Sequence, residues 1–92
     1  MEPTILTLHP EGKSGVNILK RRYDAVKDAI LAELSSREET TFKQLTSAVN
    51  TRLKKTFDGK ITWYVVTVKL DLEARGKIER VPGVSPQRLR LK

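Results

Sequence analysis

Apolar residues recur at helical spacing in three stretches of the chain. In the last third, the apolar positions follow one another at intervals of four, three and four residues: Ile61, Val65, Val68 and Leu72. This spacing places them on one face of an α-helix. Thr62 is a suitable N-cap, and Gly76 can adopt the left-handed conformation that ends a helix. The pattern therefore predicts a helix between Thr62 and Gly76, although the β-branched run 65–68 taken alone would favour a strand.

Two further helices are predicted upstream. The first runs from about Ile18 to Ser36 with Asn17 as its N-cap. Its apolar stripe consists of Leu19, Tyr23, Val26, Ile30 and Leu34. Thr41 and Gln44 fit a capping box at the start of the second, which runs to about Lys55. Its inward positions are Phe42, Leu45, Ala48, Val49 and Leu53.

The C-terminal residues alternate instead of following a helical period. Residues 77–81 read as extended, residues 82–86 contain two prolines and a glycine, and residues 87–92 alternate cations with Leu89 and Leu91. Such a pattern predicts a β-hairpin. Residues 40–42 are expected to add a short strand to it.

Residues 1–16 form a predicted N-terminal arm that precedes a domain over residues 17–92. Ile5, Leu6 and Leu8 are too apolar for a free tail. We therefore expect the arm to pack across the domain or onto a second subunit.

A helix that leads through a glycine into a basic hairpin resembles the recognition helix and wing of a winged helix-turn-helix domain. The segment LDLEARGKIERVPG is similar to the L-x-x-x-G-x-I-x-R ending of that superfamily. More closely, VNILKRRYDAVKDAIL, TFKQL, WYVVTVKLDLEARGKIERVPG and PQRLR resemble a family of small uncharacterised proteins, over Gly15 to Leu91. The resemblance implies an α+β winged helix-turn-helix fold, with three helices, a C-terminal β-hairpin wing and a short N-terminal arm. It implies no established activity.

Composition favours a single soluble domain. The 92 residues are 38% hydrophobic and 32% charged, and they contain no apolar run near the ~20 residues of a membrane helix. No secretory signal pattern opens the chain, and the lack of cysteine is compatible with a reducing compartment. We expect a cytoplasmic protein that makes no membrane contact.

Catalysis, metals and cofactors are not expected. His9 is the single histidine and has no sequence partner for a metal site or a catalytic triad. Gly12-Lys13-Ser14 resembles the end of a phosphate-binding loop, but Thr7 stands where that motif needs its first glycine. The sequence therefore predicts a protein that is not an enzyme and has no small-molecule ligand.

The positive charge of the protein indicates its function more strongly than any catalytic motif does. A net charge of +7 and a pI near 10 suit a nucleic-acid partner, although ribosomes, anionic membranes or solubility alone would also explain them. One basic cluster surrounds the turn between the second and third helices and consists of Arg52, Lys54, Lys55 and Lys60. The other lies on the wing and consists of Lys77, Arg80, Arg88, Arg90 and Lys92. Between them Tyr64, Thr67 and Lys69 are candidates for base contacts, so the primary hypothesis is a winged-helix protein that binds double-stranded DNA. The triplet Lys20-Arg21-Arg22 is either a third phosphate contact or a solvated face.

A second apolar stripe on the third helix argues against simple groove reading. It consists of Trp63, Val66, Leu70 and Ala74, roughly opposite the core stripe. An exposed stripe of this kind is usually covered, either by the N-terminal arm or by a second copy in a homodimer. The alternative function is therefore a protein-interaction module that uses Trp63, Val66 and Leu70 and binds no nucleic acid.

Overall fold

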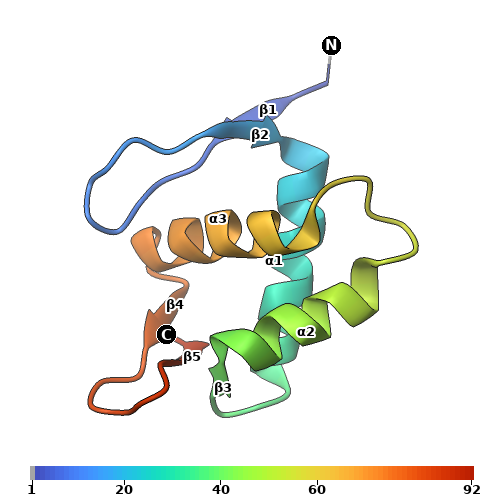
Figure 1. Ribbon diagram of the computed structural model, residues 1–92. Helices are drawn as coiled ribbons and strands as arrows, with labels where there is room; N and C mark the ends of the chain where they lie inside the picture. Colours follow the sequence, from blue (N-terminus) through green and yellow to red (C-terminus); the bar gives the residue numbers. More distant parts are fainter. Residues whose placement is uncertain (1) are drawn as a thin grey trace.

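The structure, a computed structural model, describes residues 2–92 as a small α+β domain of three helices and two sheets (Figure 1). In chain order the elements are β1 Thr4–Leu6, β2 Asn17–Leu19, α1 Lys20–Ser35, β3 Thr40–Thr41, α2 Phe42–Leu53, α3 Ile61–Ala74, β4 Ile78–Arg80 and β5 Arg88–Leu91. The helices α2 and α3 cross in front of α1, and the sheets lie at the periphery of this three-helix core (Figure 1). No helix among the described residues is long and apolar enough to cross a membrane.

The three helical stripes meet in one hydrophobic core. The innermost side chains, nearly or fully inaccessible to solvent, come from all three helices and the C-terminal hairpin: Val26, Ile30, Leu34, Leu45, Val49, Val65, Val68, Leu72, Ile78 and Leu89. All eight helical members were predicted from periodicity. Residues at the ends of the predicted stripes, such as Leu53 and Ile61, are only partly buried because they lie at the rim of the core.

The C-terminal hairpin and its third strand are confirmed. The sheet has the order β3-β5-β4 and is antiparallel, with Thr40 opposite Leu89 and Glu79 opposite Arg90. Gly76 has φ 74° and ends α3, as its position predicted. The capping box of α2 is also present, because the Gln44 amide donates to the Thr41 hydroxyl at 3.1 Å and the Gln44 side chain accepts from the Thr41 amide.

The predicted starts of two helices are wrong. Residues 17–19 form β2 instead of the first turn of α1, because they pair with residues 4–6 in an antiparallel hairpin. The backbone amide of Lys20 then donates to the Pro3 carbonyl at 3.0 Å, so Leu19 and not Asn17 occupies the N-cap. In α3 the helix begins at Ile61, and Lys60 rather than Thr62 is the N-cap, without a side-chain hydrogen bond.

The N-terminal arm is therefore one strand of a hairpin over residues 4–19. Two hydrogen bonds join the two arms of this hairpin. The Thr7 amide donates to the Val16 carbonyl at 2.9 Å, and the Val16 amide donates to the Thr7 hydroxyl at 3.0 Å. Gly15 lies so close to this crossing that an added Cβ would be 1.7 Å from the Thr7 carbonyl oxygen.

A buried carboxylate joins this N-terminal hairpin to α3. Asp71 is fully buried and accepts hydrogen bonds from the Leu8 amide at 2.8 Å, from Arg75 Nε at 2.9 Å and from the Tyr23 hydroxyl. The loop of the hairpin consequently lies along the C-terminal half of α3, where Leu8 and Val16 line a small hollow with Thr67 and Leu70. The arm thus packs across the domain, one of the two arrangements expected from its apolar residues.

Candidate nucleic-acid interface

A groove opens where the end of α2, the α2–α3 loop (residues 54–60) and the start of α3 meet. It encloses about 710 Å³. Four apolar side chains and one small polar amide line it together with two lysines and neighbouring backbone: Asn50, Lys54, Phe57, Gly59, Lys60, Ile61, Thr62, Trp63 and Val66. No acidic residue belongs to this lining, so the groove combines an apolar surface with uncompensated positive charge.

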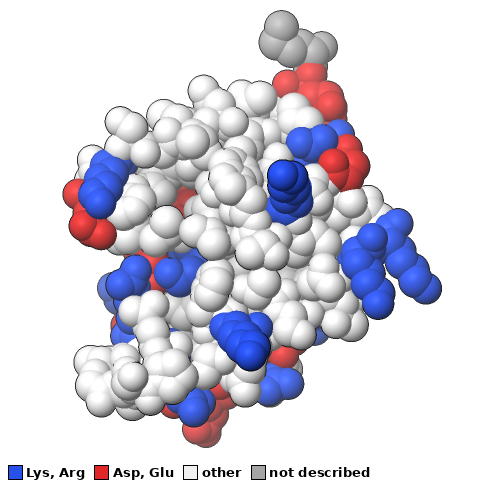
Figure 2. All heavy atoms as spheres, viewed as in Figure 1, with Lys and Arg blue, Asp and Glu red and all other residues white. Residues whose placement is uncertain are grey.

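The lysines around this loop are free of carboxylates. Among residues 2–92, Lys54, Lys55 and Lys60 make no ion pair, and all three are exposed. Figure 2 shows basic side chains gathered beside the α2–α3 loop and a largely uncharged surface over α3. We call Lys54, Lys55 and Lys60 the loop lysines. Arg52, the fourth member of the predicted cluster, lies 3.6 Å from Glu33 instead.

Asp58 is the one carboxylate of the loop, and it faces α1 rather than the loop lysines. Arg21 and Arg22 both hold it, with distances of 3.0–3.2 Å from their guanidinium nitrogens to its two oxygens. These hydrogen bonds, first from Arg21 and then from Arg22, keep the pKa of Asp58 far below its usual range. We call the three residues the Asp58 clamp. It fixes the loop to α1 and leaves the loop lysines uncompensated.

Three aromatic rings pack edge to face at the groove, and two of them, Phe57 and Trp63, line it. The ring centroids of Trp63 and Tyr64 are 4.9 Å apart at an interplanar angle of 80°, and those of Tyr64 and Phe57 are 5.1 Å apart at 78°. Gly59 allows this packing, because an added Cβ would lie 2.7 Å from the Tyr64 ring and 2.9 Å from the Phe57 ring. Trp63 is the outermost ring and is 46% exposed.

Tyr64, the first of the three predicted base contacts, is largely buried. Its side chain is 9% exposed, and its hydroxyl accepts a hydrogen bond from Arg22 Nη1 at 3.0 Å. The residue points between α1 and the loop because the buried face of α3 is wider than the stripe at positions 61, 65, 68 and 72. Tyr64 therefore packs against Trp63 and does not belong to the groove lining.

Lys69, the second predicted base contact, is also buried. It is 7% exposed, lies over the Phe42 ring and places its Nζ 3.5 Å from Glu73. Desolvation by this burial lowers the pKa of Lys69. Thr67, the third candidate, faces the N-terminal hairpin and is partly covered by it. The structure thus brings none of the three predicted base contacts into the groove.

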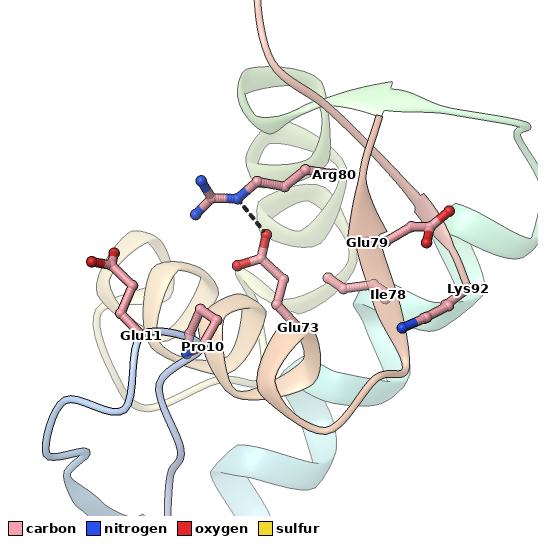
Figure 3. A pocket seen from close by; sticks show the side chains of 7 residues that line it. All are labelled: Pro10, Glu11, Glu73, Ile78, Glu79, Arg80 and Lys92. Carbon is pink, nitrogen blue, oxygen red and sulfur yellow. Dashed lines mark hydrogen bonds and ion pairs between the residues drawn. The ribbon is translucent and has the colours of Figure 1, made fainter. Parts of the chain in front are cut away.

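Each arginine of the C-terminal hairpin has an acidic partner. Arg90 Nε lies 2.6 Å from Glu79, Arg80 Nε 2.8 Å from Glu73 and Arg88 Nε 3.8 Å from Glu39. Figure 3 shows Arg80 turned onto Glu73 beside a hollow of about 340 Å³. Two of these carboxylates come from α3 and from the segment before β3, so the positive charge of this hairpin is more compensated than its own sequence indicates.

The second apolar stripe of α3 is only half covered. Leu70 is shielded by the N-terminal hairpin, whereas Trp63 and Val66 remain 46% and 38% exposed. The expectation that the arm covers the whole stripe is therefore wrong for its first half. Trp63 and Val66 belong to the wall of the groove.

Sequence reasoning missed the residues that shape the groove without carrying its charge. Arg21 and Arg22 were treated as a phosphate contact or a solvated face, whereas they hold Asp58. No local pattern in the sequence signals this contact, because Asp58 lies 37 and 36 residues from Arg21 and Arg22 along the chain. Residues 2–92 present no group of three or more histidine, aspartate or glutamate side chains arranged to bind a metal ion.

Comparison with known protein families gives one result. Residues 4–89 match the model of a family of unknown function (DUF6958). No curated protein and no solved structure matches the chain.

Proposed function

Because the chain belongs to this family of unknown function, whose description carries no activity, we propose a function from its geometry: the protein is a winged-helix nucleic-acid-binding protein that contacts the phosphates of double-stranded DNA. The α2–α3 loop supplies the main contacts and the C-terminal hairpin, as the wing, supplies weaker ones. A role in transcriptional regulation is consistent with this activity.

The order of elements supports the fold assignment within this proposal. Three helices with a short strand between the first and second, followed by a hairpin that pairs with that strand, are the arrangement a winged helix has. In that arrangement α3 and the hairpin flank one binding surface. The α2–α3 loop lies at the start of α3, so its lysines would border the same surface.

The observation that carries the proposal is the uncompensated charge of the loop lysines. Within residues 2–92 they have no ion pair, the loop carboxylate Asp58 is held by α1, and no acidic residue lies in the first turn of α3. The positive end of the α3 dipole adds to their potential. DNA phosphates bound there would neutralise these lysines. Each phosphate contact would also release counterions that are condensed on the DNA.

The wing contributes less because its arginines must exchange partners. Pairs such as Arg88–Glu39 and Arg90–Glu79 are substantially exposed, and exposed pairs of this kind are worth about 0–1 kcal/mol. A phosphate can therefore replace the carboxylate at small cost. Arg80 is held by a buried carboxylate and is the least available of the three.

Binding to a generic duplex across a salt series tests the proposal. A duplex of about 20 base pairs should bind at low salt and weaken by decades toward physiological salt, with a log–log slope of about −0.9 for each phosphate contacted. The double variant Lys54→Glu/Lys60→Glu should reduce both the affinity and the slope. The matched control Lys13→Glu/Lys27→Glu changes the net charge equally, at lysines that already face Glu11 and Asp24. Equal losses in the two variants, or no binding at low salt, would overturn the proposal.

Protein–protein interaction is the second candidate, favoured by the exposure of Trp63 and Val66. In this hypothesis Trp63 and Val66 on the outer face of α3 bind a second copy or another protein, while Leu70, the third predicted interface residue, is covered by the N-terminal hairpin. Sedimentation equilibrium of the wild type and Trp63→Ala tests the homodimer. A concentration-dependent dimer that the substitution dissociates would favour this candidate, and a monomer at all concentrations would exclude self-association.

A further inference from the structure

Trp63 is the feature that the proposed duplex contacts leave unused. Its ring is 46% exposed at the mouth of the groove, and its orientation is fixed by the edge-to-face contact with Tyr64. Tyr64 in turn is held by Phe57 and by the hydrogen bond from Arg22. The exposed ring is therefore a rigid flat surface and loses little conformational freedom when it binds.

The lysines beside this ring indicate that its binding partner is negatively charged. Lys54 and Lys60 line the same groove, have no ion pair within residues 2–92, and share the groove with no acidic residue. Asn50 adds an amide that can donate and accept hydrogen bonds. The occupant is thus expected to be anionic, flat and apolar on its face, and able to form hydrogen bonds at its edge.

Duplex DNA offers no such face, because its bases are stacked on one another and only their edges are accessible. An unpaired nucleotide offers all three properties, since its base can stack on an aromatic ring while its phosphates meet lysines. Resting on the proposed nucleic-acid function, we propose that this groove binds an unpaired base of single-stranded DNA, stacked on Trp63 with Lys54 and Lys60 at the flanking phosphates.

The fluorescence of Trp63 measures this stacking directly, because it is the single tryptophan of the chain. Purified protein is titrated at low salt with oligothymidylate of about 12 nucleotides and, separately, with a blunt duplex of equal phosphate number. The oligothymidylate should quench the emission and bind more tightly, whereas the duplex should bind without comparable quenching. Quenching that is equal for both probes would overturn the inference.

Two variants separate stacking from charge. Trp63→Ala should weaken oligothymidylate binding by roughly 5- to 100-fold and leave duplex binding almost unchanged. Trp63→Phe, which keeps an aromatic face, should retain most of the affinity. Leu6→Ala is the control, because Leu6 is an exposed apolar side chain on β1 that lies outside the groove lining. Circular dichroism and thermal melting verify that each variant is folded. Unchanged oligothymidylate binding in folded Trp63→Ala would remove Trp63 from the site.

The remaining outcomes distinguish this inference from the function on which it rests. Duplex binding with no preference for oligothymidylate would overturn the inference and leave the proposed function standing. Binding of neither probe would overturn both. A glutamate-rich peptide that quenches Trp63 as strongly as the oligonucleotide would overturn the nucleotide assignment in favour of an acidic protein segment.

Discussion

Arg22 at the start of α1 donates a hydrogen bond from Nη1 to the hydroxyl of Tyr64 on α3, with a separation of 3.0 Å. The same guanidinium group binds Asp58 in the α2–α3 loop. One side chain of α1 therefore positions both the aromatic support of the groove and the loop that carries its lysines. The positions of Trp63 and of the loop lysines depend on α1, although α1 does not line the groove.

Truncation of Tyr64 should destabilise the fold more than it affects any contact with DNA. Tyr64→Ala should lower the free energy of unfolding by about 3–5 kcal/mol, since it removes a buried aromatic ring. Tyr64→Phe, which loses only the hydrogen bond from Arg22, should cost about 0.5–1.5 kcal/mol. Urea denaturation measures both, with the exposed Thr62→Ala as control. A wild-type unfolding midpoint for Tyr64→Ala together with weaker DNA binding would restore Tyr64 as a contact residue.

Opening the Asp58 clamp should strengthen DNA binding. Asp58→Asn removes the carboxylate that neutralises Arg22 and that shares Arg21 with Glu2, so the net positive charge near the start of α1 increases. The affinity for duplex should therefore rise, and the salt slope should steepen by up to about 0.9 per additional phosphate contact. Because the pKa of Asp58 is lowered in the fold, the carboxylate stays ionised at pH values below the usual aspartate pKa. Its stabilising contribution is complete above that usual pKa and is lost as the pH falls into strong acid.

Asp28→Asn is the matched control for this change. Asp28 is exposed on α1 and makes no ion pair within residues 2–92, so the variant changes the net charge equally and leaves the clamp closed. Equal gains in affinity for both variants would show that net charge alone acts.

Ionisation of Tyr23 should make the fold sensitive to alkali. Burial, followed by the hydrogen bond to Asp71, raises the pKa of Tyr23 to about 12. Tyrosine in an unfolded chain ionises near pH 10. The folded state therefore favours the neutral form, and the resulting stability is complete below about pH 10 and is lost as the pH rises to about 12. Urea unfolding across this range should show a shallower decline in Tyr23→Phe than in the wild type, and parallel declines would contradict the assignment.

Gly15→Ala should detach the N-terminal hairpin without affecting the groove. Its Cβ would overlap the Thr7 carbonyl, a backbone group that cannot rotate away, so we expect a cost of about 1–3 kcal/mol and faster exchange of the Thr7 amide hydrogen. Gly12→Asn is the control, because position 12 has open space and asparagine tolerates its φ of 76°. DNA binding at low salt should stay at the wild-type level, and a loss of binding would place the hairpin in the interface.

Local patterns in the sequence were sufficient to predict the three helices, the capping box of α2, the glycine that ends α3 and the C-terminal hairpin with its third strand. Except for the third strand, in which Thr40 pairs with the distant Leu89, each of these features depends on neighbours within a few residues. Strand β2 was missed because its partner β1 lies more than ten residues away and no tight turn joins them. Residues 18 and 19 are apolar, so they fit the helical pattern of α1 as well as they fit a strand, and the local sequence does not distinguish the two.

The candidate site was less predictable because the neutralisation of a cation depends on contacts between distant residues. Glu79 is the one acidic residue within segment 77–92, whereas Glu39 and Glu73 reach the arginines of the C-terminal hairpin from other elements. Asp58 stands beside the loop lysines in the sequence, whereas it binds Arg21 and Arg22 of α1. The loop lysines and the exposure of Trp63 and Val66 were anticipated, while the burial of Tyr64 and Lys69 required the packing of α3 against its neighbours.

The middle position of β5 determines when the sheet can form. Strands β3 and β4 do not pair with each other, because both pair with β5, residues 88–91, which lies between them. Thr40 pairs with Leu89, which follows it by about fifty residues in the chain. The sheet therefore depends on contacts of long sequence separation, which form later than local helical contacts. A released chain that ends before Arg88 should therefore form its helices but lack this sheet.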